Sequence, residues 1–184
     1  MSRLFFDLAD GKVLTFESEA MRVADARFPY QNLIAVGLTL PPRIQLRAED
    51  EVGGYFRCEL ATAQVFKDLV DLIQYRIQPL IVLRILNAVF VQKLAHRIDR
   101  VQLDATGFRV IEGWGQEKNF PWERYESSAL EHDKMAIYVK EGITAAKKIF
   151  DTEYGGMNVC LLPGIMAACA RAYQDPEPGS LSRL

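Results

Sequence analysis

A chain of 184 residues suits one ordinary domain or two small ones. Its 49% hydrophobic and 25% charged residues are the balance of a globular protein, which excludes an intrinsically disordered chain. The formal net charge of −2 gives no basic excess, so nucleic acid is not expected as a partner.

The N-terminal third predicts short antiparallel strands. Residues 14–23 (LTFESEAMRV) alternate apolar and polar side chains, which is the period of a strand with one buried face. The phrase RFPYQNL follows at residues 27–33, and its Pro29 fixes φ and removes a donor, so we expect a strand to end there. The pair Gly53-Gly54 predicts a hairpin turn. The opening MSRLFFDLADGK predicts no signal peptide, because no long apolar stretch follows its charge.

Two helices are predicted in the middle of the chain. Residues 61–77 place their apolar side chains on one broad face. Gln78-Pro79 interrupts this pattern, and a second helix from Pro79 to about residue 98 is apolar over most of its circumference, which predicts burial on several sides. Its apolar run at residues 80–90 is too short to span a bilayer and contains Arg84 and Asn87.

The second half repeats three stretches of the first half in the same order. Residues 101–110 (VQLDATGFRV) match residues 14–23, and NFPWERY at residues 119–125 matches RFPYQNL. EYGGMNVCLL at residues 153–162 matches EVGGYFRCEL at residues 51–60, which predicts a second hairpin at Gly155-Gly156. The spacing between the copies grows along the chain, so we expect insertions in the second copy. Residues 141–150 (EGITAAKKIF) predict a short helix within one of them.

These segments resemble the pleckstrin-homology (PH) superfold, and the bacterial PH-like and GRAM-like families in particular. The matching stretches are LTFESEAMRVADARFPYQNLIAV and VQLDATGFRVIEGWGQEKNFPWERY. Each reads as an alternating strand, a turn, a strand ending in hydrophobic-Pro-aromatic, a polar pair and a further strand. The resemblance covers most of residues 14–77 and 101–173. It implies two curved antiparallel sheets of short strands, each closed by a C-terminal amphipathic helix.

The expected fold class is therefore α+β, with two PH-like antiparallel β-barrel or sheet repeats, each followed by a helix, joined by a central apolar helix. The expected domains are residues 1–78 (first repeat), 79–98 (connecting helix) and 99–174 (second repeat with its insertion helix). The Pro/Gly/Ser-rich tail at residues 175–184 is expected to be disordered. A single larger α+β domain of another topology is the alternative.

Candidate catalytic and metal-binding groups are few. The two histidines are His96, expected at a helix end beside Asp99, and His132, in a polar turn. Cys58 and Cys160 are expected on equivalent strands and Cys169 on a helix, all as buried thiols of a reducing, cytoplasmic compartment. No spacing typical of metal ligands, phosphate loops or nucleophile elbows is present. We therefore expect no catalytic residue, no metal and no cofactor, and no small-molecule ligand is identified. An enzyme of unrecognised type is the alternative.

The central helix carries the functional prediction. It is more apolar than a small sheet can cover, which favours a non-enzymatic interaction or assembly module that binds a protein partner or a second copy of itself. The predicted interface residues are Arg84, Ile85, Val89, Phe90 and Lys93. Burial of the same helix as internal core is the alternative.

Peripheral binding to an anionic membrane is a further alternative. Positive residues outnumber negative ones across residues 65–100, and basic amphipathic helices can lie on anionic lipid. The PH resemblance implies head-group binding by Lys or Arg in the first hairpin loop. Here that loop, DLADGK, contains Asp7 and Asp10, which disfavours head-group recognition.

Overall fold

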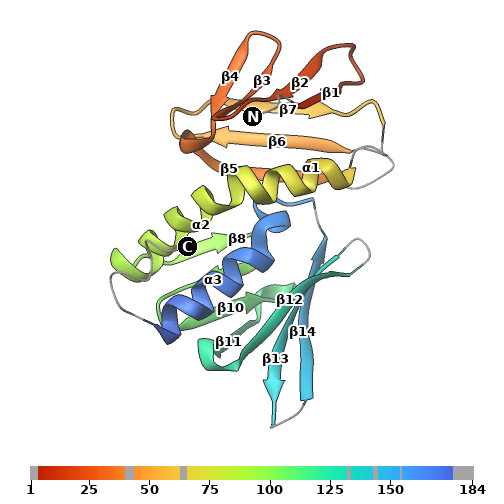
Figure 1. Ribbon diagram of the computed structural model, residues 1–184. Coiled ribbons are helices and arrows are strands. Elements are labelled where there is room, and N and C mark those ends of the chain that lie inside the picture. The colour runs from red at the N-terminus through yellow and green to blue at the C-terminus, as the bar shows by residue number, and fades with distance from the viewer. Residues whose placement is uncertain are drawn as a thin grey trace. The chain divides into compact units, whose positions relative to one another are not determined.

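The computed structural model describes residues 4–39, 44–62, 66–131, 134–142, 145–153 and 155–175 (Figure 1). The chain divides into two compact units, Met1–Ile81 and Val82–Leu184, which are described separately below. Three predictions fall outside the described residues. They concern the tail after Asp175, the turn that contains His132, and residues 63–65 of the first predicted helix.

The first unit contains two antiparallel sheets followed by a helix. The first sheet has the order β1-β2-β3-β4 and the second has the order β5-β6-β7. The bounds are β1 Leu4–Asp7, β2 Val13–Phe16, β3 Ala20–Val23, β4 Ala26–Pro29, β5 Leu33–Thr39, β6 Gln45–Asp50, β7 Tyr55–Glu59 and α1 Phe66–Leu72. A single bridge between Leu8 and Leu60 joins the two sheets where β1 and β7 end.

The predicted alternation places the core of this unit. Leu14 and Phe16 of β2 are fully buried, whereas Val13, the first residue of the strand, is exposed. The rings of Phe6 and Phe16 pack edge to face at 5.7 Å. The predicted hairpin at Gly53-Gly54 is confirmed, because these residues connect the paired strands β6 and β7 and Gly53 has a φ of 81°.

The helix after β7 continues through Pro79. A π-helical turn, Ile73–Ile77, lies between α1 and α2 (Gln78–Leu86), and its widened hydrogen bond runs from the N–H of Gln78 to the carbonyl of Ile73. Such a turn accommodates the proline, which lacks the N–H that a regular helix needs. A second π-helical turn, Asn87–Val91, ends the helix. The expected extension to residue 98 is wrong, because residues 96–98 pair as strand β8 and place His96 on that strand.

The second unit repeats the order of four strands, three strands and a helix. Its sheets have the orders β11-β10-β9-β8 and β12-β13-β14. The bounds are β8 His96–Ile98, β9 Val101–Leu103, β10 Gly107–Ile111, β11 Glu117–Pro121, β12 Tyr125–Glu131, β13 Lys134–Glu141, β14 Ala145–Glu153 and α3 Leu162–Gln174. Helix α3 packs beside β12 (Figure 1). The chain is thus mixed α+β, as predicted, and its described residues form four antiparallel sheets without a closed barrel.

The two copies of the Phe-Pro-aromatic phrase occupy the same place in the two units. In each, the proline ends the fourth strand, the next aromatic residue starts a single 3-10 turn, and the following strand begins the second sheet. The strand register agrees as well: Ala20 lies opposite Pro29 and Met21 opposite Phe28 in the first unit, and Gly107 lies opposite Pro121 and Phe108 opposite Phe120 in the second.

The aromatic residue after the proline, Tyr30 in the first unit and Trp122 in the second, is buried and donates a hydrogen bond to the turn after the second strand of its unit. The Tyr30 hydroxyl donates to the carbonyl oxygen of Glu17 at 2.9 Å. The indole Nε1 of Trp122 donates to the carbonyl oxygen of Asp104 at 2.9 Å. Glu17 directly follows β2 and Asp104 directly follows β9, so the same connection closes each four-stranded sheet.

Three predictions for the second half are wrong. The expected insertion helix at residues 141–150 is wrong for the residues that the structure describes: Glu141 ends β13, and residues 145–150 belong to strand β14, which pairs with β13. Gly155-Gly156 connects β14 to a 3-10 turn, Val159–Leu161, and forms no hairpin, so Cys160 is not a strand residue. In this sheet, β13 pairs antiparallel with β12 and with β14. Ala and Lys are good helix formers, but helix propensity is a weak preference that strand pairing overrides here.

Candidate interaction surface

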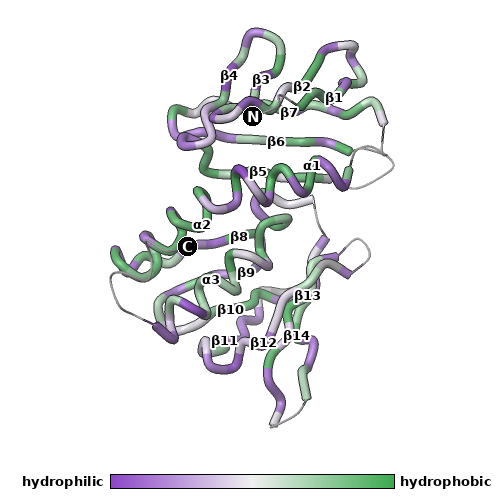
Figure 2. Tube along the Cα trace, viewed as in Figure 1, coloured by the Kyte–Doolittle hydropathy of each residue, from purple (hydrophilic) through white to green (hydrophobic). Residues whose placement is uncertain are grey.

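The helix that ends at Val91 and the residues directly after it present an exposed apolar stripe formed by Leu83, Val91 and Leu94. Their exposed fractions are 49%, 60% and 57%. The exposed Asn87 lies about one helical turn from Leu83 and from Val91, so these residues line one side of the segment. Figure 2 shows the predominantly hydrophobic colouring of this segment. Leucine and valine side chains this open to water are candidates for contact with another molecule.

The five predicted interface residues fall into three groups. Ile85 and Val89 are buried, at 3% and 0% exposure, and belong to the hydrophobic core. Arg84 and Phe90 are half-buried, and Lys93 is exposed. The residues that border the exposed stripe are therefore Arg84, Phe90 and Lys93.

The sequence did not single out the three residues of the exposed stripe. The helix is apolar on most sides, so its periodicity does not distinguish the face that packs inward from the face that meets water. The only signal was spacing, because Leu83 and Val91 lie on the side of the helix opposite to that of Ile85 and Val89.

Lys93 marks the end of the helix. It has a φ of 58°, the left-handed conformation that commonly terminates helices. The N–H of Gln92 donates to the carbonyl of Asn87, and the N–H of Leu94 donates to that of Ala88, both at 2.9 Å. These bonds satisfy carbonyls of the last turn and hold Leu94 beside the helix end.

The sequence that contains the exposed stripe is basic. No acidic residue occurs between Asp71 and Asp99 in the sequence. Lys93 and Arg97 are exposed beyond the helix end, and Arg97 Nε donates to the carbonyl oxygen of Asp99 at 2.7 Å. An apolar stripe with a basic rim favours a partner that is apolar and acidic.

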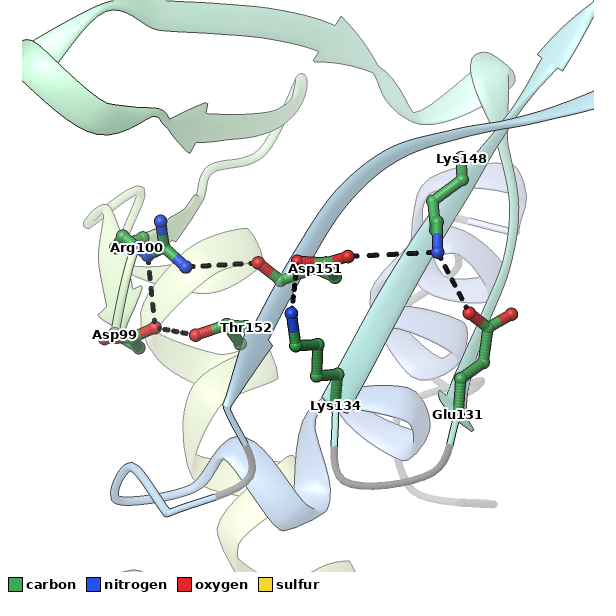
Figure 3. Close-up of polar contacts among 7 residues, drawn as sticks. All are labelled: Asp99, Arg100, Glu131, Lys134, Lys148, Asp151 and Thr152. Atoms are coloured by element: carbon green, nitrogen blue, oxygen red, sulfur yellow. Dashed lines mark hydrogen bonds and ion pairs between the residues drawn. The ribbon is translucent and has the colours of Figure 1, made fainter.

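The second unit also contains a network of charged and polar side chains that could in principle carry chemistry (Figure 3). Thr152 is buried and its hydroxyl donates to Asp99 Oδ2 at 2.6 Å. Arg100 lies 3.7 Å from the same carboxylate oxygen, donates to the carbonyl of Asp151 at 3.1 Å, and stacks over the ring of Phe150. These contacts fasten the β8–β9 turn, where Asp99 has a φ of 51°, to strand β14.

The network continues across the sheet as ion pairs on β12, β13 and β14. Asp151 accepts contacts from Lys134 at 3.9 Å and Lys148 at 3.8 Å, and Lys148 also lies 3.2 Å from Glu131. Glu131 is a hydrogen-bond acceptor for the Tyr138 hydroxyl as well. Each charge has an opposite charge beside it in open surroundings, so the arrangement stabilises the sheet and presents no activated acid, base or nucleophile.

The cysteines and the described histidine do not form a reactive centre either. All three cysteines are buried thiols, and burial raises the pKa of Cys58 and of Cys169 to about 12, which keeps both protonated at neutral pH. Burial lowers the pKa of His96 below its ordinary value. Among the residues that the structure describes, no group of His, Cys, Asp and Glu is placed to hold a metal ion.

Within the described ranges, no helix combines the length and hydrophobicity needed to cross a bilayer. The exposed stripe is thus the feature of the second unit with the clearest functional implication. Comparison of the chain with protein-family models, with curated proteins and with solved structures found no significant match.

Proposed function

We propose that this chain is a cytoplasmic, non-enzymatic protein-binding module of two PH-like repeats, and that the exposed stripe of Leu83, Val91 and Leu94 binds an acidic amphipathic segment of a partner protein. The observation that carries this proposal is the coincidence of three open aliphatic side chains with a stretch of sequence, residues 72–98, that contains basic residues and no acidic ones. The proposal keeps Arg84, Phe90 and Lys93 as interface residues and treats Ile85 and Val89 as core.

The repeat part of the proposal is supported by local geometry. Both units have the order of four strands, three strands and a helix. Both use a buried aromatic residue after a proline to bond the turn that follows the second strand, with equal distances of 2.9 Å. An independent origin of the same register and the same bond in two sheets would be a coincidence.

A second copy of this chain fits the surface less well than an acidic partner does. A symmetric contact would bring the Lys93 and Arg97 side chains of one copy close to those of the other copy, because the same patch faces itself. Like charges at a closed contact oppose binding, whereas aspartate or glutamate on a partner would be attracted to both side chains.

An anionic membrane also fits the sign of the charge, but the apolar surface is small. Burial of one methylene contributes about 0.8 kcal/mol, and a whole myristoyl chain gives only marginal, reversible membrane binding. The exposed parts of two leucines and one valine offer less apolar surface than that chain. A helix in a groove needs only a few such anchors at helical spacing, so a protein partner is favoured.

The test is a selection from a displayed library of helical peptides. We expect enrichment of sequences with Leu, Ile or Phe at one-turn spacing and with Asp or Glu beside them, with dissociation constants on the order of micromolar for so small a contact. The paired substitution Leu83→Ser with Val91→Ser should abolish binding. The control is Val52→Ser, which changes a more exposed valine, at 84%, on the β6–β7 turn of the first unit.

Three results would contradict this assignment. Enriched peptides without acidic residues would remove the charge argument, and a consensus that still binds the Leu83/Val91 variant would place the contact elsewhere. Sedimentation that shows a wild-type dimer, dissociated by that variant, would identify a second copy as the occupant. Anionic vesicles that retain the wild type but not the variant would identify a membrane.

A further inference from the structure

The first unit contains a pocket of about 500 Å³ that shares no lining residue with the exposed stripe. Its walls come from three segments of that unit. These are the turn after β2 (Ser18 and Glu19), the end of β4 with the 3-10 turn that follows, and the helical residues Tyr75 to Leu80. The pocket therefore lies directly beside the first Phe-Pro-aromatic phrase.

One backbone oxygen accepts hydrogen bonds from two of the residues that line the pocket. The carbonyl oxygen of Glu17 accepts hydrogen bonds from the Tyr30 hydroxyl, at 2.9 Å, and from the guanidinium of Arg76. The N–H of Tyr30 also donates to the carbonyl of Glu19 at 2.8 Å. Tyr30 is only 4% exposed, so the base of the pocket is fixed before any ligand arrives, which lowers the entropic cost of binding.

Two arginine side chains line the pocket. Arg76 donates to a carbonyl oxygen that has no formal charge, so this bond orients the guanidinium without neutralising it. Arg27 is 46% exposed, and its Nε lies 3.9 Å from the carboxylate of Glu17, which Arg22 approaches at 3.6 Å. Glu19 is the acidic residue of the lining. Arg27 and Arg76 are the cationic residues of the lining, and their guanidinium groups favour an anionic group.

The lining also contains a ring and apolar side chains, next to the polar Ser18 and Gln31. Tyr75 is 72% exposed although it is a large aromatic residue on a helix, and Pro29, Pro79 and Leu80 surround the same space. An exposed tyrosine ring beside guanidinium groups offers a stacking surface next to an anion site. The two features together select a ligand that has an aromatic body and an anionic head.

We propose that this pocket binds an aromatic group that carries a single carboxylate or phosphate. Arg27 and Arg76 contact the anionic head, and Tyr75 stacks against the ring. Such a group occurs both in free aromatic acids and at the end of a peptide that has a C-terminal phenylalanine. Both sources share the chemistry that the pocket recognises.

The test is a titration of the ¹⁵N-labelled full chain, followed by amide chemical shifts, with phenyl phosphate, phenylacetate and neutral phenylacetamide. Inorganic phosphate is the fourth probe. We expect shifts around residues 18, 27–31 and 75–80 with the two aromatic anions, and affinity at least about tenfold lower for the amide and for inorganic phosphate. Acetyl-Gly-Phe, with its C-terminal amide as the neutral control, is then compared with phenylacetate. Tighter binding of acetyl-Gly-Phe identifies a peptide C-terminus as the source of the ligand, and tighter binding of phenylacetate identifies a free acid.

The chain offers a matched pair of arginine variants. Arg22 and Arg27 are both 46% exposed and both approach the Glu17 carboxylate, but only Arg27 lines the pocket. Arg27→Gln should weaken phenyl phosphate binding about tenfold, and Tyr75→Ala should weaken it several-fold, whereas Arg22→Gln should change it less than about twofold. Equal effects of the two arginine variants, equal binding of the neutral amide, or shifts confined to other residues would overturn the proposal.

Discussion

The indole of Trp122 is hydrogen-bonded to the backbone of Asp104, which lies 18 residues earlier in the chain, before strands β10 and β11. Its Nε1 donates to the Asp104 carbonyl at 2.9 Å, and the ring is 1% exposed among Phe108 and Tyr125. Tyr30 and Glu17 have the same relationship in the first unit. The repeated phrase is thus a structural device that anchors the end of each four-stranded sheet.

The two anchors differ in how much each depends on its aromatic donor. Trp122→Phe removes the indole N–H from the Asp104 carbonyl and should cost about 1–3 kcal/mol. Tyr30→Phe should cost only about 0.5–1.5 kcal/mol, because the Glu17 carbonyl keeps its bond from Arg76. Urea unfolding of both variants measures the difference, and a larger loss for Tyr30→Phe would contradict it.

Complete removal of either ring should be more severe. Tyr30→Ala and Trp122→Ala each leave a cavity at a buried site and should lose about 2–4 kcal/mol. The same unfolding measurement checks this. Loss of partner binding with unchanged stability would instead make these residues part of a binding site.

Gly107, which matches the buried Ala20 of the first unit, has a close-packed environment. A Cβ at Gly107 would lie 2.2 Å from the backbone oxygen of Phe120, and backbone cannot move aside as a side chain can. Gly107→Ala should therefore cost about 1–3 kcal/mol or more. Gly113→Ala is the control, since a Cβ there meets nothing within 4 Å, and should be neutral or stabilise by up to about 1 kcal/mol. Equal effects in thermal unfolding would refute this reading.

The bond between Thr152 and Asp99 should contribute more to stability than the ion pairs near it. Thr152→Val removes a buried hydroxyl that donates to a carboxylate and should cost about 1.5–3 kcal/mol. Lys134→Gln removes an exposed ion pair of 3.9 Å and should cost less than about 1 kcal/mol. Denaturant midpoints of the two variants test the order, and Thr152→Ser should restore the wild-type value.

His96 should make the protein less stable as the pH falls through about 6.5, the ordinary pKa of histidine. Burial lowers the pKa of His96 in the folded state, so the unfolded chain binds a proton at a pH where the folded chain does not. The stability that neutral His96 provides is therefore fully present well above pH 6.5 and decreases as the pH falls below that value. His96→Gln should reduce that decrease in melting temperature. An unchanged pH dependence in the variant would show that His96 does not cause it.

The strand-rich parts of the fold were predictable because their signals are local. Alternation at residues 14–23 and 101–110, the proline of each phrase and the Gly53-Gly54 turn depend on neighbouring residues alone. Strand β14 was not predictable in this way, because AAKKIF has helix-forming residues and becomes a strand through pairing with β13. Gly155-Gly156 resembles Gly53-Gly54 in sequence but not in structure. Gly53-Gly54 forms the turn of the β6–β7 hairpin, whereas Gly155-Gly156 precedes a 3-10 turn.

The candidate surface was predictable to the level of the helix but not of its face. Arg84, Phe90 and Lys93 border the exposed stripe, whereas Ile85 and Val89 are core residues. An amphipathic helix reveals its buried side through periodicity, and this helix has apolar residues on nearly every side. Which side meets water depends on packing that only the three-dimensional structure supplies.

The most direct test of the proposed function is a charge reversal at the rim of the exposed stripe. The affinity of a selected acidic peptide, and of the same peptide with lysine in place of its acidic residues, is measured by fluorescence anisotropy against the wild type and against Lys93→Glu with Arg97→Glu. We predict that the wild type prefers the acidic peptide and that the variant prefers the basic one, each by about tenfold at low salt. A variant that keeps the wild-type preference would contradict the proposed surface.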